Sequence, residues 1–261
     1  MSKQAKLVII NENFTQNMAL SKKLSVIIPA YNEEKRIAGT LDSVDSYLKK
    51  QDYDYEIIVI DNDSNDGTFN LVKDLAGGKM ANLRIVKAHE KGKGGAVAFG
   101  VNTQATAEYI MFMDADNATP ISEIEKFWPY FNQGYSVVIG SRYLEGSNVT
   151  RKQPFYRIAL SRMANMLIQF LTVPGIKDTQ LGFKVFTRQA AKDIFSHVTI
   201  FRWGFDMEVL TIARQHEYKI KELPVLWREQ GGSHVPLKAY IESLIDLFKI
   251  KLNVLLDRYK K

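Results

Sequence analysis

The stretch Tyr109-Ile110-Met111-Phe112-Met113-Asp114-Ala115-Asp116 decides the fold of this 261-residue chain. Its five apolar residues in a row predict a strand that is buried on both faces, as in parallel sheets. Two carboxylates, Asp114 and Asp116, follow directly where that strand ends. Parallel sheets bind ligands beyond the carboxyl ends of their strands. The stretch therefore predicts both an α/β fold and the edge at which its site lies.

Further apolar runs and helix-like spacings surround this strand. Strands are expected at 24–29, 56–60, 83–88 and 136–140, with helices at 33–50, 66–75 and from about 94. The second half is expected to hold helices at 154–173, 205–215 and 236–259 and short strands at 183–186 and 220–227. Repeated strand–helix units predict a mostly parallel sheet with helices on both faces. We expect an N-terminal extension over 1–23, one α/β domain over 24–235 and a C-terminal amphipathic helix over 236–261.

The composition is that of an ordinary globular protein, with 46% hydrophobic and 25% charged residues. The absence of cysteine excludes a disulfide scaffold, an iron–sulfur cluster and a cysteine nucleophile. The net charge is +6, and its basic excess lies in 142–162 and 236–261. Such segments attract anionic lipid, nucleic acid or phosphorylated substrates. We find neither a signal peptide nor a transmembrane helix, which predicts a cytoplasmic protein.

Asp114 and Asp116 are the clearest candidates for chemistry. Two carboxylates at a strand end suit Mg²⁺ or Mn²⁺, hard cations that prefer oxygen ligands. The alternative is a simple turn, which Asp also favours. The segment 61–68 superficially resembles a calcium-binding loop, but its twelfth position is Val72 and not the required glutamate. Asp66 in it is expected to cap the next helix.

The segment Lys91-Gly92-Lys93-Gly94-Gly95 precedes a predicted helix. Glycines at a helix N-terminus, with two lysines beside them, favour an anion, although the signal is weak by itself. The four histidines show no metal-ligand spacing, so we expect core or exposed roles for them.

Three segments together resemble the inverting GT-A glycosyltransferases of family 2. They are 26–34, 58–68 and 113–116. Five others resemble the dolichyl-phosphate glucosyltransferases, which move glucose from UDP-glucose to a polyprenyl phosphate. These are 91–96, 140–143, 178–184, 202–208 and 223–227. The resemblance implies a Rossmann-like GT-A fold and covers about residues 24–261. It departs from the family pattern at Asn62, where an aspartate is usual, and at Leu181, where a cysteine is frequent.

The resemblance also implies roles for individual residues. Donor-binding positions are matched by Pro29, Tyr31, Glu33, Asp61, Lys91 and Asp114. Asp114 and Asp116 match the motif for Mg²⁺ or Mn²⁺, with Asp116 as the more direct ligand. The acceptor phosphate site is matched by Arg142, Arg157 and Ser161. Arg202 matches a position near the donor diphosphate, and Asp178 starts an acidic loop beside the reaction centre.

The resemblance thus predicts inverting transfer of glucose from UDP-glucose to polyprenyl phosphate. GDP-mannose is an alternative donor, although related mannose synthases carry a metal-binding glutamine where Ala118 stands. A saccharide acceptor and a non-catalytic nucleotide-sugar-binding protein are further alternatives. The expected partners are a nucleotide sugar, a polyprenyl phosphate and the cytoplasmic face of a membrane, bound peripherally, and no nucleic acid. For the final helix, packing within the chain or a homodimer contact competes with membrane contact.

Overall fold

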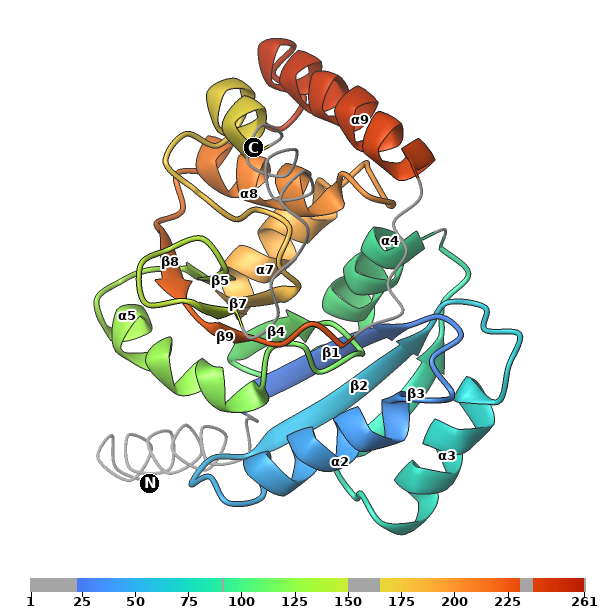
Figure 1. Ribbon diagram of the computed structural model, residues 1–261. Helices are drawn as coiled ribbons and strands as arrows, with labels where there is room; N and C mark the ends of the chain where they lie inside the picture. The colour runs from blue at the N-terminus through green and yellow to red at the C-terminus, as the bar shows by residue number, and fades with distance from the viewer. Residues whose placement is uncertain (1–22, 91, 150–164, 231–236, 261) are drawn as a thin grey trace, which may run out of the picture.

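The computed structural model describes residues 23–90, 92–149, 165–230 and 237–260 (Figure 1). Three of the predicted site residues, Lys91, Arg157 and Ser161, lie outside these ranges, so their roles stay predictions.

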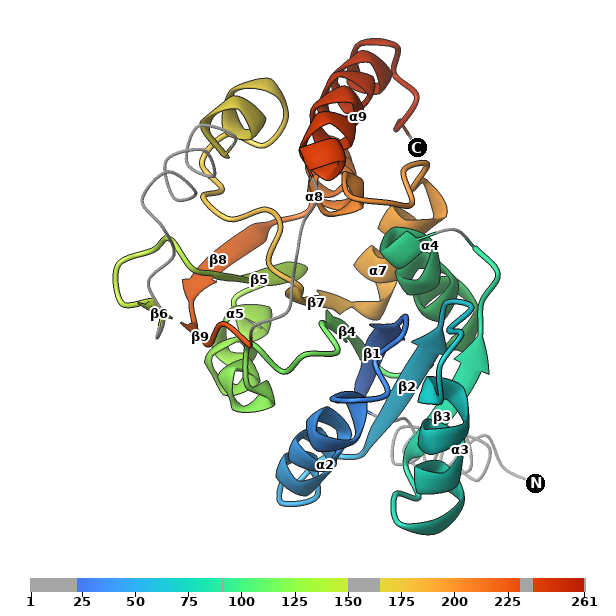
Figure 2. The same cartoon turned by 45° about the vertical axis from the view of Figure 1, so that its right-hand side comes forward.

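A seven-stranded sheet forms the centre of the molecule, in the order β3-β2-β1-β4-β7-β5-β8 (Figure 2). Its strands are β1 (Leu24–Ala30), β2 (Tyr55–Asp61), β3 (Leu83–Lys87), β4 (Tyr109–Met113), β5 (Val137–Ser141), β7 (Phe183–Thr187) and β8 (Ile220–Pro224). All neighbouring pairs are parallel except those of β7, which runs antiparallel to β4 and β5. A separate two-stranded sheet pairs β6 (Asn148–Val149) with β9 (Leu226–Trp227). The predicted mostly parallel sheet is confirmed.

Helices cover both faces of the large sheet, as predicted (Figure 1). One face packs on α2 (Ile37–Leu48), α3 (Thr68–Gly78), a 3₁₀ turn (Ile121–Lys126) and α5 (Trp128–Asn132). The other packs on α4 (Gly92–Phe99), which continues as a π-helical turn (Gly100–Gln104), and on α7 (Arg188–Ser196) and α8 (Phe205–Gln215). The α2 side chains at helical spacing, Ile37, Leu41, Val44 and Leu48, are all buried. Successive β1 residues divide between the two apolar cores, which explains the uninterrupted apolar strand.

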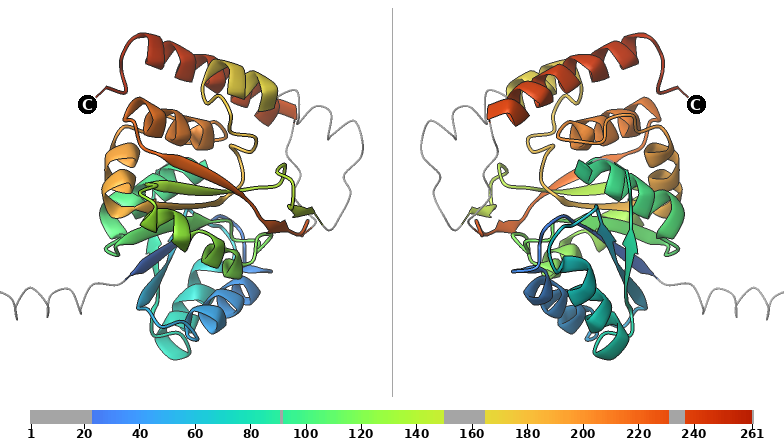
Figure 3. Two further views of the ribbon diagram at one scale, coloured as in Figure 1. Left: turned by 90° about the vertical axis from the view of Figure 1, so that its left-hand side faces the viewer. Right: turned by 90° about the vertical axis from the view of Figure 1, so that its right-hand side faces the viewer.

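Helix α9 (Leu237–Leu255) packs on α8, and the helical segment 165–171 lies at the same end of the molecule, with a gap between it and α9 in Figure 2 (Figures 1 to 3). Both lie at the end of the molecule opposite α2 and α3 (Figure 3). None of the helices in the described part of the chain is long and apolar enough to cross a membrane.

The end of the chain differs from the prediction of one helix to residue 259. Helix α9 ends at Leu255, and Asp257 has a left-handed backbone with φ 54°. The chain therefore turns, and the Tyr259 side chain enters the core with 2% of its surface exposed. The predicted helix end at 259 is wrong, and Tyr259 does not share a helix face with Leu252 and Leu255, because their spacing puts them on one face only while the helix continues.

Candidate active site at the carboxyl edge of the sheet

Asp114 and Asp116 follow β4 in a closely fitted turn. The Thr40 hydroxyl donates to the carbonyl between them, that of Ala115, at 2.7 Å. The Ala118 amide donates to Asp116 Oδ1 at 3.0 Å. A Cβ added at Gly182 would lie 2.3 Å from the Asp114 carboxyl, so glycine is required beside it. The two carboxylates are thus held at the edge where the sequence predicts the site.

The negative charges of Asp114 and Asp116 at this edge favour binding of a cation. Lys93 Nζ lies 2.5 Å from Asp114 Oδ1. Burial alone would lower the pKa of Lys93, but Asp114 and Asp206 outweigh it and raise that pKa. Burial and the neighbouring Asp114 charge raise the pKa of Asp116. Two neighbouring carboxylates, both partly buried, match the oxygen donors that Mg²⁺ and Mn²⁺ prefer, so the residues fit such an ion.

Asp61 ends β2 two strands from Asp114, because β1 lies between β2 and β4. It is paired in register with Ala30, next to Pro29. Only 1% of Asp61 is exposed, and its Oδ1 has no hydrogen-bond partner among the described residues. A buried acceptor without a donor costs about 1–3 kcal/mol, so this atom is suited to an N–H group of a ligand.

The loops after β1 and β2 are tied to each other. The Asn32 amide donates to Ser64 Oγ, and Asn32 Oδ1 accepts from the Asn65 amide at 2.8 Å. Asp66 accepts from the amides of Glu34 and Thr68, so it joins both loops and binds the first residue of α3. The segment therefore acts as a structural turn, in place of a calcium loop.

Two predicted donor-binding side chains lie in the first of these loops. Tyr31 is 56% exposed at the sheet edge. The Glu33 carboxylate pairs with Arg36, whose pKa is raised by that hydrogen bond although burial opposes it. The Asp114 and Asp116 charges contribute to the same rise, so Arg36 lies within electrostatic reach of both carboxylates.

Asn62, the departure from the family pattern, has a clear structural task. Its Nδ2 donates to the carbonyls of Ala88 and Glu90, at 3.3 and 2.5 Å. It thereby holds the segment after β3 against the end of β2. A carboxylate at this position has no hydrogen to donate.

Two amides of the glycine-rich turn at the start of α4 bind a backbone carbonyl of the 199–205 region. The Gly94 and Gly95 amides both donate to the Phe201 carbonyl, at 2.9 and 3.3 Å. A Cβ at Gly94 would lie 2.5 Å from Phe205 Cβ. These glycines therefore allow close contact with the 199–205 region, and their two amides are already engaged.

Arg142 forms an ion pair with a buried carboxylate, that of Asp178. Its Nε and Nη2 donate to the two oxygens of Asp178 at 2.8 and 2.9 Å, and its amide donates at 3.0 Å. Burial opposes ionisation of Asp178, but the Arg142 charge and hydrogen bonds outweigh it and lower the pKa of Asp178. Tyr143 and Trp227 rings flank the guanidinium. Asp178 is fully buried, so it contacts Arg142 and not the open edge.

Arg202 lies on the segment that joins α7 to α8. Its side chain is exposed, with Glu242 of α9 at 3.6 Å. Sequence reasoning missed a buried pair, Lys184 of β7 and Asp206 of α8, whose charged atoms lie 2.5 Å apart. Burial lowers the pKa of Lys184 and raises that of Asp206. Lys93 was also missed as the partner of Asp114, although it belongs to the quoted glycine-rich segment.

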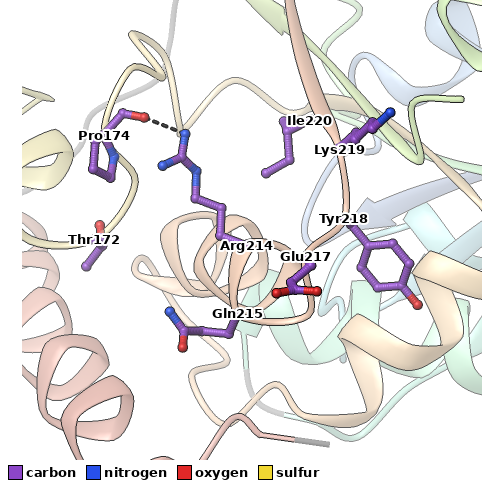
Figure 4. Close-up of a pocket in the computed structure, with 8 residues that line it drawn as sticks. All are labelled: Thr172, Pro174, Arg214, Gln215, Glu217, Tyr218, Lys219 and Ile220. Carbon is purple, nitrogen blue, oxygen red and sulfur yellow. Dashed lines mark hydrogen bonds between the residues drawn. The ribbon is translucent and has the colours of Figure 1, made fainter. Parts of the chain in front are cut away.

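Two features lie away from this edge. A surface hollow of about 560 Å³ opens at the start of β8, where Arg214 donates to the Pro174 carbonyl (Figure 4). None of the predicted site residues lines it. A group formed by Asp193, His197 and His216 has the composition of a metal site. Both His216 nitrogens are already engaged, with the Asp193 carboxylate and the Tyr259 carbonyl, which indicates a structural role.

The mostly parallel sheet with its acidic edge is the architecture of the GT-A glycosyltransferases, and comparison with known proteins agrees. The family model for glycosyl transferase family 2 matches residues 25–195, and the chain belongs to this family. Solved structures with the same fold include glucosyl-3-phosphoglycerate synthase of Mycobacterium tuberculosis with Mn²⁺, UDP-glucose and phosphoglyceric acid. It has a TM-score of 0.65 at 19% identity and covers 88% of this chain and 80% of that one.

The particular relatives are more specific. The chain is 36% identical to the human dolichyl-phosphate beta-glucosyltransferase over 260 residues, which covers 92% of this chain and 78% of that protein. It is also 36% identical to the enzyme of the same name from Dictyostelium discoideum, over 91% of this chain and 76% of the relative.

Proposed function

We propose that the protein transfers glucose from UDP-glucose to a polyprenyl phosphate, such as dolichyl phosphate, with inversion at the anomeric carbon. The main structural support is the position of Arg142. Its guanidinium interacts with the Asp114 charge and so lies near the carboxylate pair, on the side away from Asp61 and β2. A cation there suits an acceptor phosphate, while Asp61 suits the nucleotide. The named activity of the similar proteins supports the same substrates.

The donor would lie across the ends of β1, β2 and β4. The unpartnered Asp61 Oδ1 would accept the uracil N–H, and Tyr31 would cover the nucleotide. Asp114 and Asp116 would hold Mg²⁺ or Mn²⁺, which neutralises charge on a diphosphate leaving group. Arg202 would bind the same diphosphate from the opposite side.

The acceptor needs little activation by the protein. A phosphate monoester is largely ionised at neutral pH because its second pKa is near 6. One of its oxygens would attack the anomeric carbon as the bond to the UDP oxygen breaks, giving the β-linked lipid phosphate sugar and UDP. Arg142 would hold the attacking phosphate, and Asp178 would act as a positioning residue that fixes the guanidinium. Arg157 and Ser161 remain predicted partners of this phosphate.

An exposed apolar platform suits a lipid acceptor. We define it as Met166, Phe170, Ile241, Leu244, Ile245, Phe248, Leu252 and Leu255, each 45–83% exposed. Such a surface on neighbouring helices marks an interaction site, and its natural occupant here is the membrane that carries the substrate. Lys249 and Lys251 on the same helix favour anionic lipid.

The transfer experiment uses purified protein, polyprenyl phosphate and Mg²⁺ or Mn²⁺ with a panel of labelled nucleotide sugars. Label from UDP-glucose in the organic phase is the expected result. Label from GDP-mannose alone would correct the donor and keep the acceptor. UDP binding with no lipid label from any donor would overturn the proposal.

The membrane contact is tested by flotation with vesicles that contain anionic lipid. Phe248→Glu, in the middle of the platform, should abolish flotation because it places a charge in the apolar contact. Asn70→Glu adds the same charge on the exposed surface of α3 and should leave flotation unchanged. Sedimentation of the protein as a dimer that Phe248→Glu dissociates, with no flotation of either, would assign the platform to a second copy of the chain.

A further inference from the structure

The last turn of the chain is joined to the donor side of the site through one buried carboxylate. Glu208 lies on α8 with none of its surface exposed. Its Oε1 accepts from the Tyr259 hydroxyl at 2.7 Å and from the Thr199 hydroxyl at 2.5 Å. Its Oε2 accepts from the amides of Thr199 and Ile200 at 2.9 and 2.7 Å. One carboxylate therefore binds two parts of the chain that lie about 60 residues apart.

Tyr259 is anchored at both ends. Asn253 Nδ2 donates to its hydroxyl at 2.9 Å, and His216 Nε2 contacts its carbonyl. Burial and then the bond to Glu208 raise the pKa of the hydroxyl, so it stays protonated as a donor. The tail after α9 is thus a fixed element and not a loose end of the helix.

The segment 199–202 connects the residues that Glu208 binds to Arg202, the proposed donor-binding residue. Directly after Ile200, the Phe201 carbonyl accepts from the Gly94 and Gly95 amides at the start of α4. Arg202 follows, and Glu242 of α9 lies 3.6 Å from it. A groove of about 600 Å³ lies between this segment and α9 and is lined by residues of both. The position of Arg202 therefore depends on the bonds that hold Thr199 and Ile200 to Glu208, together with those that hold Phe201 to α4.

We propose that Glu208 and Tyr259 are positioning residues that fix the 199–202 segment, so that the C-terminal tail sets the affinity of the donor site. The inference rests on the proposed function in one respect, which is that Arg202 faces the donor diphosphate.

The test compares Tyr259→Phe with Tyr55→Phe. Each variant removes one buried tyrosine hydroxyl that donates to a carboxylate, and Tyr55 contacts Asp45 at 2.8 Å near the opposite edge of the sheet. UDP binding with Mn²⁺ is measured by calorimetry, and hydrogen exchange is followed in peptides that cover 94–95 and 199–202. Tyr259→Phe should weaken UDP binding about three- to tenfold, the equivalent of one hydrogen bond, and speed exchange in both peptides. Tyr55→Phe should do neither.

A second variant removes another hydrogen bond to the Glu208 carboxylate. Thr199→Val removes the hydroxyl that shares Glu208 Oε1 and should give the same two changes. Equal effects of Tyr259→Phe and Tyr55→Phe on UDP binding and hydrogen exchange would overturn the inference, and so would unchanged UDP binding in Tyr259→Phe. In either case lipid transfer by the wild type would still support the proposed function. A wild type that binds UDP and transfers nothing to lipid would overturn the proposed function alone.

Discussion

Arg142 and Asp178 form a two-pronged ion pair in which the carboxylate is fully buried and the Arg142 side chain is 22% exposed. The planar guanidinium can bind two carboxylate oxygens and still present hydrogens to a phosphate. Lysine offers only a point charge. Asp178 therefore holds the guanidinium in place, and Arg142 keeps hydrogens to donate to the proposed acceptor phosphate.

Arg142→Lys should impair the acceptor more than the donor. We expect the KM for polyprenyl phosphate to rise about tenfold or more, which matches the loss of a charge-assisted hydrogen bond, with the KM for UDP-glucose changed less than about twofold. Steady-state kinetics with both substrates give the two values. Arg84→Lys is the control, because Arg84 contacts Glu56 and Gln104 near the opposite end of β3. Equal changes in both KM values would contradict the assignment of Arg142 to the acceptor.

Asp178→Asn should destabilise the protein in a pH-dependent way. Loss of the Asp178 charge leaves Arg142 without a counterion, and in similar buried pairs this lowers the free energy of unfolding by about 3 kcal/mol. Because folding lowers the pKa of Asp178, its stabilising contribution is complete above the unfolded value of about 3.9. It is lost as pH falls through the lower folded value. Urea unfolding should therefore show a constant difference in the free energy of unfolding between wild type and variant above about pH 5, and a shrinking difference below about pH 4. A difference in the free energy of unfolding that does not change with pH would contradict an ionised Asp178.

Gly182→Ala should damage the metal edge without unfolding the protein. The new Cβ would lie 2.3 Å from the Asp114 carboxyl and push it aside. We expect kcat to fall about tenfold or more, because misplacement by about 1 Å can cost a hundredfold. Gly39→Ala in α2 meets nothing within 4 Å and serves as the control. It should keep full activity and gain about 0.5–1 kcal/mol of stability. Full activity in Gly182→Ala would show that Asp114 does not need its present position.

Asn62→Asp tests the departure from the usual family residue. The carboxylate would face two carbonyl oxygens and lose both hydrogen bonds that Asn62 donates. We expect about 1 kcal/mol lower stability and weaker UDP binding, since the segment after β3 is released beside Asp61. Thermal melting and calorimetry measure the two effects. Unchanged melting and binding would mean that the segment is held by other contacts.

Much of the fold could be predicted because it depends on local pattern. Uninterrupted apolar runs gave the parallel strands, and the rule for their carboxyl ends brought Asp61, Asp114 and Asp116 to one edge. The reversed direction of β7 could not be predicted, because a short apolar run looks the same in either orientation. Pairing with β4 and β5 decides its direction.

The site was predictable in position but not in its partners. The sequence motif located Asp178, yet its burial behind Arg142 depends on the tertiary contacts of a loop. Lys93 and Lys91 both stand in the same glycine-rich segment, and only the structure shows that Lys93 reaches Asp114. Tyr259 continued the apolar spacing of α9, and the left-handed turn at Asp257 removed it from that face.

The anomeric configuration of the lipid product shows whether the transfer inverts the sugar. The sugar in UDP-glucose is α-linked, and a single displacement by a phosphate oxygen held near Arg142 must invert it. Polyprenyl phosphate and ¹³C-labelled UDP-glucose would be incubated with the protein and a divalent cation, and the extracted lipid examined by NMR. We expect β-linked glucosyl phosphate. An α-linked product would contradict the single displacement, and glucose found only in free sugar would contradict the lipid acceptor.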